Sequence, residues 1–460
     1  MSEMLNPSEE IAGGSEKLSI KEKLSYGVGD IASNFVWGIV TSYLLFFYTD
    51  IFGITAAAAG TLFLITRLWD AINDPIMGVI IDKTKSKHGK TRPYLLYLSV
   101  PLAIIGVLTF ITPDFSATGK LIYAYVTYTL LGMVYTAINL PYGALMTRMT
   151  RDSGEKGELN SYRGMGRTIG AIIVSACTLP LANYLGNGNQ QIGFPITMGI
   201  YSLIAVVLFM VTFKNCQERV APSITPKQQS PVRKSALDML KNKYWVIIAI
   251  STILWFLRMG MMNAALIYYV NYYLERPGTI PLYLTLLNLA NFVGAILALF
   301  ALKKWGSRNT SIIMYTLATI IFVFLFMLGG ESTILFATLF FIANIFTGFG
   351  DPANLTMLGD SIDYHEWKFG DRVEGLLFSG YSFALKFGVA IGSALVAYVL
   401  GWVGYDPDAV TEQAKNVMRI LTFGVPIFLT LLQAITLIFY KLDKFHPKII
   451  EELEARKMVE

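Results

Sequence analysis

Three polar residues of the segment TRLWDAINDP, namely Asp70, Asn73 and Asp74, interrupt an otherwise apolar stretch. Spacings of three and four residues place them on one face of a helix. If that helix crosses a membrane, each carboxylate costs roughly 2.5–3.5 kcal/mol to insert, and two ionised carboxylates one turn apart repel each other. A monovalent cation held by their oxygens, or a proton on one of them, would offset this cost. The alternative is a structural ion pair with Arg67, one turn before Asp70.

A second set of polar residues lies within the first apolar stretch, at helical spacing. Asp30, Asn34 and Trp37 are each about one turn apart. Asp30 lies near the start of the stretch and is expected to make an interhelical bond. The Asn34 amide can bind a hydroxyl group, so this row could line a cavity, although amide packing between helices is the alternative.

The segment YTAINLPYGAL places Tyr135, Thr136 and Asn139 just before Pro141. A proline inside a helix frees a carbonyl, and polar groups beside a broken helix are typical of substrate sites in transporters. A packing kink is the alternative. Further along, Arg163 could clamp a hydroxyl or carboxylate group together with Arg167, or both could extend to the membrane interface.

Two charged residues stand in the last third of the chain. Lys386 lies inside SFALKFGVAIG, too deep to reach the interface easily, and a buried lysine needs a carboxylate or a ligand oxygen. Asp351 precedes Pro352 in FGDPANL, which indicates an interrupted helix. A pair between Asp351 and Lys386 is one possibility that the sequence leaves open.

The composition supports a membrane setting for all these residues. Of the 460 residues 54% are hydrophobic and only 15% are charged, against about 25% in a typical soluble protein. This excludes a cytosolic enzyme and indicates a polytopic membrane protein. Twelve apolar stretches are long enough to span a bilayer, and each must be helical there. They cover residues 26–48, 60–81, 94–112, 121–146, 163–185, 193–213, 244–273, 280–301, 310–329, 334–357, 375–402 and 416–440.

The positive charges predict how these helices are oriented. If both termini are cytoplasmic, loops on the other side hold only Lys120, Arg276 and Lys415 among the 37 lysines and arginines. The predicted organisation is then a cytoplasmic tail, a six-helix half, a linker rich in Pro, Gln and Ser, a second six-helix half and a second cytoplasmic tail. These parts cover residues 1–25, 26–213, 214–243, 244–440 and 441–460. Two six-helix halves about a central cavity suggest the major facilitator fold.

Other classes of function find no support in the sequence. Two cysteines are too few for a disulfide framework or a structural zinc site. No phosphate-binding loop, metal-ligand cluster or nucleophile with its base is present. The net charge of +5 is better explained by topology than by nucleic acid. We therefore expect no enzyme activity, no cofactor and no nucleic-acid partner.

Several segments together resemble the glycoside–pentoside–hexuronide:cation symporters. They are KLSYGVGD, TRLWDAINDPIMG, SKHGKTRPYLL, INLPYGAL and GDSIDYHEWKFGDRVEG. The resemblance runs from about residue 20 to residue 445. In that family the acids of the second helix and a threonine of the fourth form the cation site, which implies a site made of Asp70, Asn73, Asp74 and Thr136 here.

The resemblance also implies a sugar site, with departures from the melibiose carrier of that family. Asn34 and Asn139 stand where that carrier has acids, and Gly143 and Asp351 stand where it has tryptophans. Ser382 replaces a threonine. The positions that match the family are Tyr135, Arg163 and Lys386. With Asp30 and Trp37, these residues complete the predicted sugar site, and the missing acids make melibiose itself a poor candidate.

The predicted function is therefore symport of a sugar with Na⁺, or with H⁺ or Li⁺, by alternating access. A glycoside or a pentoside such as a xyloside suits a neutral pocket lined by asparagines. A proton-coupled hexuronide carrier, a lysolipid symporter and a transport-dead sensor or membrane enzyme are the alternatives. The expected partners are the sugar, the cation and the lipid of a bacterial-type inner membrane, and the expected state is a monomer.

Overall fold

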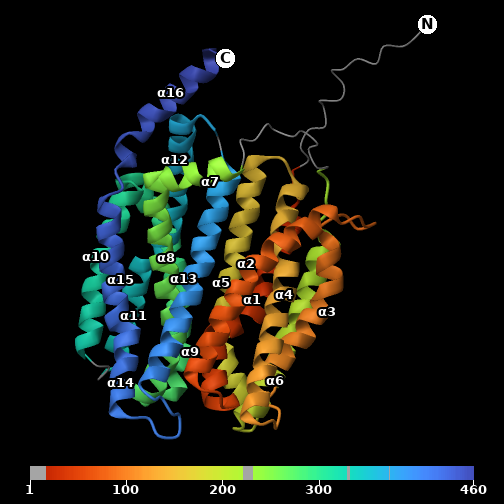
Figure 1. The fold of residues 1–460 in the computed structure, drawn as a ribbon, viewed down its shortest axis with the longest axis vertical. Coiled ribbons are helices and arrows are strands. Elements are labelled where there is room, and N and C mark those ends of the chain that lie inside the picture. The colour runs from red at the N-terminus through yellow and green to blue at the C-terminus, as the bar shows by residue number, and fades with distance from the viewer. Residues whose placement is uncertain (1–16, 221–231, 329–331, 372, 460) are drawn as a thin grey trace.

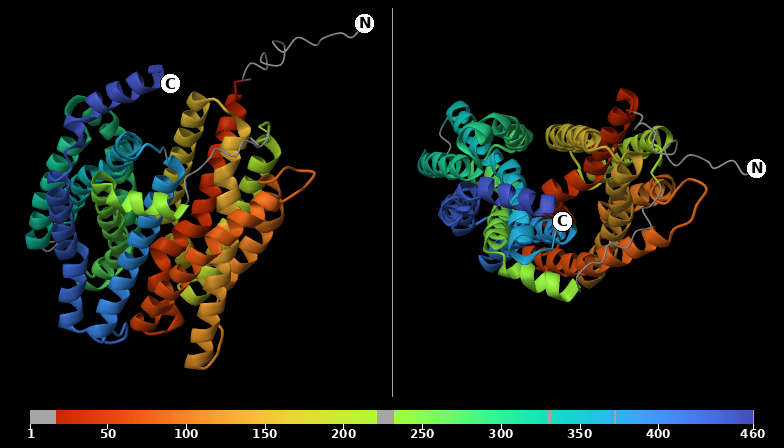
Figure 2. Two further views of the ribbon diagram at one scale, coloured as in Figure 1. Left: turned by 45° about the horizontal axis from the view of Figure 1, so that its top comes forward. Right: turned by 90° about the horizontal axis from the view of Figure 1, so that it is seen from above.

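The computed structural model describes residues 17–220, 232–328, 332–371 and 373–459. The tail predicted over 1–25 and the linker predicted over 214–243 therefore lie partly outside the described residues. Among those that are described, no β-strand occurs. The chain folds into two groups of long helices that stand side by side (Figures 1 and 2).

The first group, the N-terminal half, contains six helices. They are α1 (Ile20–Phe46), α2 (Ala56–Lys83), α3 (Arg92–Thr109), α4 (Ala117–Met149), α5 (Ser153–Leu185) and α6 (Gln190–Asn215). A π-helical turn, η1 (Phe47–Phe52), extends α1. Each helix covers one predicted span, and the sequence SIKE starts α1 with a capping box between Ser19 and Glu22.

The second group, the C-terminal half, also crosses six times, with two of the crossings divided. Its helices are α8 (Lys243–Tyr268), α9 (Ile280–Trp305), α10 (Ser307–Leu328), α11 (Thr333–Gly348), α12 (Gly350–Phe369), α13 (Glu374–Trp402), α14 (Glu412–Arg419) and α15 (Val425–Ile438). Short π and 3₁₀ turns join them: η2 (Tyr269–Tyr273), η3 (Pro277–Thr279), η4 (Ile420–Gly424) and η5 (Leu442–Lys444). The helix interruption predicted at Asp351 is confirmed, because α11 ends at Gly348 and α12 begins at Gly350.

Eleven helices among the described residues are long and apolar enough to cross a membrane. The predicted span that is not among these eleven is α2, which has 28 residues but carries Arg67, Asp70 and Asp74 inside the apolar run. Two further helices, α7 (Val232–Lys241) and α16 (His446–Val459), lie at the same end of the bundle in Figure 1, which we call the linker end. The other end is called the closed end, because hydrogen bonds join the two halves there.

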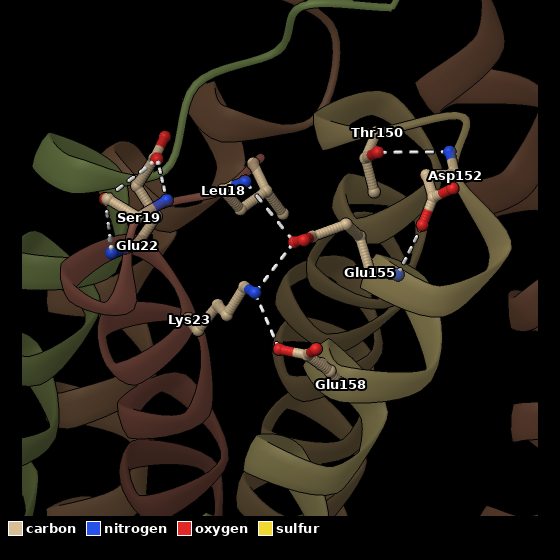
Figure 3. Close-up of polar contacts among 8 residues, drawn as sticks. All are labelled: Leu18, Ser19, Glu22, Lys23, Thr150, Asp152, Glu155 and Glu158. Carbon is tan, nitrogen blue, oxygen red and sulfur yellow. Dashed lines mark hydrogen bonds and ion pairs between the residues drawn. The ribbon is translucent and has the colours of Figure 1, made fainter. Parts of the chain in front are cut away.

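Polar contacts fasten the N-terminal half together at the linker end. Lys23 of α1 forms ion pairs of 2.9 Å with Glu155 and 2.6 Å with Glu158, both of α5 (Figure 3). The backbone N–H of Leu18 also donates to Glu155, while Asp152 caps the first turn of α5. The amino-terminal ends of α1 and α5 are thereby held side by side.

The residues after α6 fold back onto the same end. The Glu218 carboxylate accepts hydrogen bonds from the backbone N–H groups of Lys90, Thr91 and Arg92, at the start of α3. Burial alone would raise the pKa of Glu218, but these bonds favour the ionised form and hold the pKa below its usual value. Arg219 pairs with Glu22 of α1 at 2.6 Å. This segment therefore ties α6, α3 and α1 together.

Several hydrogen bonds that join the two halves lie towards the closed end. The hydroxyl groups of Thr49 and Tyr268 are 2.7 Å apart, and those of Thr61 and Tyr398 are 2.8 Å apart. Asp50 of η1 accepts hydrogen bonds from Tyr272 and from the Tyr405 hydroxyl group, at 2.8 Å in the second case. We call Asp50 and these two tyrosines the Asp50 latch.

Candidate functional site

The two carboxylates of α2 are each paired with a basic residue. Asp70 accepts a hydrogen bond of 3.0 Å from Arg67, as the structural alternative predicted. Asp74 pairs with Lys386 of α13, so this ion pair joins the two halves. The side chains of Lys386 and Asp74 are 44% and 22% exposed. This pair is therefore accessible to an incoming ion or ligand.

Close helix crossings place Lys386 opposite α2. A Cβ built on Gly392 of α13 would lie 2.2 Å from the Leu257 carbonyl oxygen of α8, and a Cβ on Gly388 would lie 2.7 Å from the Ile253 oxygen. Only glycine permits backbones to approach this closely. At the closed end, Gly60 of α2 packs against Ala397 of α13 in a similar way. These contacts fix α13 against both α8 and α2.

The other predicted members of the cation site lie on α2 and α4. Asn73 is buried and its Nδ2 atom has no hydrogen-bond partner among the described residues, nor does Oδ1 of Asp74. Thr136 of α4 is buried as well, and Gly132, one turn earlier, faces Oδ1 of Asp70. The structure thus brings α2 and α4 together but shows no direct bond between Thr136 and either carboxylate among the residues it describes.

Asp30 has the structural role predicted for it. Its carboxylate lies 2.7 Å from Nε of Arg163 and accepts a hydrogen bond of 3.1 Å from the Tyr142 hydroxyl group. The Arg163 guanidinium lies 4.8 Å from the centre of the Tyr142 ring. The close crossing of α1 and α5, where Gly166 meets the Gly27 backbone, holds this cluster together. Arg163 is therefore occupied with Asp30 in this conformation.

The predicted row along α1 makes contacts within the N-terminal half. The Asn34 amide donates to the Asp30 carbonyl oxygen of its own helix. Trp37 stacks on Tyr135 with ring centres 4.4 Å apart, and the Arg67 guanidinium of α2 lies 5.1 Å from the Trp37 ring centre. Trp37 therefore connects Arg67, which binds Asp70, to Tyr135, which belongs to the predicted sugar site.

The remaining sugar-site candidates come from both halves. Asp351 accepts a hydrogen bond of 2.8 Å from the Tyr381 hydroxyl group. The possible pair of Asp351 with Lys386 is not formed, because Lys386 pairs with Asp74 on the other half. Ser382 is exposed and Asn139 is half-buried. Contrary to the predicted broken helix, α4 runs without interruption through Pro141.

The role of Arg167, either a clamp with Arg163 or an interface residue, was left open by the prediction, and Asp50 was not predicted. Arg167 is exposed on α5 and interacts electrostatically with Tyr135 and with Asp351, so it faces both halves. Its spacing of one turn from Arg163 was the available signal. Asp50 lies in the sequence YTDIF at the end of the first span, where an acid looks like an ordinary loop residue. Its tyrosine partners are more than 200 positions away, and no local pattern connects them.

Comparison with known proteins agrees with this architecture. A family model described as "MFS/sugar transport protein" matches residues 25–444. The chain is 35% identical over 447 residues to the inner membrane symporter YicJ of Escherichia coli (strain K12), and the match covers 96% of both chains. It is 35% identical over 441 residues to the isoprimeverose transporter of Lactiplantibacillus pentosus, covering 95% of this chain and 91% of the relative.

The fold has a counterpart among solved structures. The crystal structure of the nucleoside transporter NupG superposes with a TM-score of 0.61 at 14% sequence identity, over 91% of this chain and 100% of the other. This likeness supports the fold alone. The family match and the symporter relatives make the protein a multi-pass transporter of the inner membrane and not an enzyme. The chain belongs to the family of MFS/sugar transport proteins.

Proposed function

We propose that the protein couples uptake of a glycoside or pentoside to Na⁺, with the cation bound at Asp70 and Asp74. The observation that carries the proposal is the accessible ion pair between Asp74 and Lys386, which joins the halves. Two carboxylates next to Arg67 and Lys386 form a set without net charge. A cation that enters this set must replace one of the two basic partners.

Lys386 is the partner that a cation can replace. Its side chain is 44% exposed, and an exposed ion pair contributes at most about 1 kcal/mol. Arg67 is more firmly held, since its side chain is 20% exposed and also packs on Trp37. A sodium ion bound by Asp74 therefore releases Lys386 at small cost. The free ammonium group is then available to a sugar oxygen, which couples the binding of the two substrates.

The proposed sugar site lies between the halves, around Lys386. Asn139 of α4 and Ser382 of α13 supply neutral hydrogen-bonding groups, while Arg167 and Asp351 supply charged ones from opposite halves. A neutral glycoside, such as a xyloside, can satisfy the amide and hydroxyl groups. The name of the relative from Lactiplantibacillus pentosus, an isoprimeverose transporter, supports a glycoside of this class.

Alternating access would follow from the position of the contacts between the halves. The hydrogen bonds at the closed end, including the Asp50 latch, hold that side shut. The excess of Lys and Arg in the segments at the linker end supports a cytoplasmic position for that end. The conformation is then an inward-facing one, in which Asp74 and Lys386 exchange ions with the cytoplasm.

A second candidate is a proton-coupled hexuronide carrier. Two exposed cations, Arg167 and Lys386, favour it because a uronate carboxylate would pair with either. In that case a proton on Asp74 would release Lys386. The difference between the candidates is thus the ion that neutralises Asp74 and the charge of the sugar.

Ligand-induced thermal stabilisation of the purified protein tests the proposal. A xyloside, an α-galactoside, a β-glucoside and a glucuronide are each added with and without Na⁺ at constant ionic strength. We expect stabilisation by one neutral glycoside that increases with Na⁺ and is lost in Asp74→Asn. The exposed loop variant Asp114→Asn is the control and should behave as the wild type. Stabilisation by the glucuronide alone, dependent on pH and not on Na⁺, would favour the second candidate.

A further inference from the structure

Arg258 of α8 is fully buried inside the C-terminal half and has no ionic partner among the described residues. Its exposed fraction is 0%, and none of its three guanidinium nitrogens has a hydrogen-bond partner in the part of the chain that the structure describes. The Trp255 ring centre lies 5.8 Å from the guanidinium carbon. That cation–π contact offsets only a part of what it costs to bury an unpaired charge. The protein must therefore offset this charge in another way.

The surroundings of Arg258 offer hydrogen-bond donors. Tyr315 of α10 is fully buried and interacts electrostatically with Arg258, and its hydroxyl group lies within reach of the Gln433 and Ser251 side chains without a hydrogen bond of good geometry to either. Asn354 of α12 accepts a hydrogen bond from Ser251, 3.0 Å away, which leaves the Nδ2 atom of Asn354 without a partner there. Among the described residues, the unpartnered donors are then the three guanidinium nitrogens of Arg258 and Nδ2 of Asn354, and the one unpartnered oxygen of Gln433 lies beside Tyr315. A set of donors around a cation is suited to a negative ligand.

The start of α12 adds positive potential at the same place. A Cβ built on Gly350, the first residue of α12, would lie 2.3 Å from the Tyr315 hydroxyl oxygen and 2.5 Å from Nε1 of Trp255. The dipole of this 20-residue helix favours an anion at its first turn, although Pro352 has no N–H group and the N–H group of Ala353 donates to the Phe349 carbonyl oxygen. The nearest acid along α12, Asp351, accepts its hydrogen bond from Tyr381 and forms no ion pair with Arg258.

We propose that Arg258, Tyr315 and the amino-terminal turn of α12 form an internal site for a small monovalent inorganic anion such as chloride. A larger ligand is excluded by the packing, because Gly350 already contacts Tyr315 and Trp255. The anion neutralises Arg258 and joins α8, α10 and α12, so it stabilises the half that carries Lys386. It is a structural ligand that stays with the protein, and this site is independent of the proposed cation and sugar sites.

Thermal unfolding of the purified full-length protein tests the site. Chloride is titrated against gluconate at constant Na⁺ concentration and ionic strength, with no sugar present. The wild type is expected to unfold at higher temperature as chloride rises, with saturation, because the ligand binds only the folded state. Arg258→Gln should lose this response. The surface variant Arg456→Gln, which alters an exposed arginine of α16, should retain it.

A milder variant keeps the test decisive if Arg258→Gln does not fold. Tyr315→Phe removes one donor and should raise the half-saturating chloride concentration about tenfold. Equal stability of the wild type in chloride and gluconate would overturn the proposal, as would an Arg258→Gln protein that is more stable than the wild type in both salts. If Arg258→Gln and Asp351→Asn each destabilise the protein and together restore it, Asp351 is the partner of Arg258 and the anion site is wrong.

Discussion

The Asp50 latch leads to a prediction about the equilibrium between the shut and the open state of the closed end. Asp50 of the N-terminal half accepts hydrogen bonds from Tyr272 and Tyr405 of the C-terminal half, so these bonds exist only while the closed end is shut. Asp50→Asn preserves the size of the side chain but removes the negative charge. Both tyrosine hydroxyl groups donate to Oδ1 of Asp50, while Thr49 donates to Oδ2, so the amide oxygen of asparagine can still accept both tyrosine bonds, now as a neutral group.

The expected size of the effect follows from these two bonds. A hydrogen bond to a charged group contributes about 1.5–3 kcal/mol, and a neutral one about 1 kcal/mol. Two bonds to a charged acceptor that become bonds to a neutral one therefore amount to about 2 kcal/mol in favour of the open state. Such a change corresponds to a shift of roughly 30-fold in the equilibrium between the two states. Thr61→Ala, which removes one neutral bond to Tyr398, should shift it about fivefold.

Distance measurements between two spin labels by pulsed electron paramagnetic resonance detect this shift. Tyr184 and Trp402 are highly exposed residues at the closed ends of α5 and α13, so cysteines at these positions can carry the labels. Cys177 is replaced by Ser, while Cys216 is buried and can remain. We expect a longer-distance population that is small in the wild type, larger in Thr61→Ala and largest in Asp50→Asn. The loop variant Asp114→Asn serves as the control.

Two results would refute this reasoning. An unchanged distance distribution in Asp50→Asn would mean that the latch does not hold the closed end. An equal shift in Asp114→Asn would mean that loss of any acid at this side, and not of the hydrogen bonds to Tyr272 and Tyr405, opens the protein.

Two further predictions concern the packing and the linker end. Gly166→Ala should lower the thermal stability of the purified protein by about 1–3 kcal/mol, because the new Cβ would lie 2.1 Å from the Gly27 carbonyl oxygen. Gly164→Ala, with no atom within 4 Å, should be neutral or slightly stabilising, and equal effects of the two would contradict the close crossing. Glu218→Gln should lower stability at pH 7 by about 1 kcal/mol. Since the pKa of Glu218 is lowered by folding, its stabilisation is present above the unfolded value of about 4.3 and is lost as the pH falls through the folded value. Unfolding temperatures between pH 3 and pH 7 should therefore depend less on pH in the variant, and parallel curves would contradict this.

The arrangement of helices was largely predictable because membrane burial imposes simple rules. Long apolar runs must be helical in lipid, so each of the twelve spans corresponds to one crossing. The pair of Asp70 with Arg67 also follows from local spacing. The uninterrupted course of α4 through Pro141 did not follow, because neighbouring helices can support a proline inside a membrane helix.

Ion pairs between residues that are far apart in the sequence could not be predicted. Lys386 needs a carboxylate, and Asp351 was the partner that the sequence suggested, whereas the crossing of α13 with α2 brings Lys386 to Asp74. Arg163 pairs with Asp30 for the same kind of reason, through the crossing of α1 with α5. Such choices depend on which backbones approach each other, and glycines such as Gly166 control this without a recognisable local pattern.

The measurement that tests the central proposal most directly is uptake of the stabilising sugar into proteoliposomes. An inward Na⁺ gradient is compared with an inward proton gradient, in the wild type, in Asp74→Asn and in the Asp114→Asn control. The proposal predicts accumulation driven by Na⁺ in the wild type and the control, and only equilibration in Asp74→Asn. Accumulation by Asp74→Asn at the wild-type level under a Na⁺ gradient would contradict the assignment of the cation to Asp74 and its exchange with Lys386.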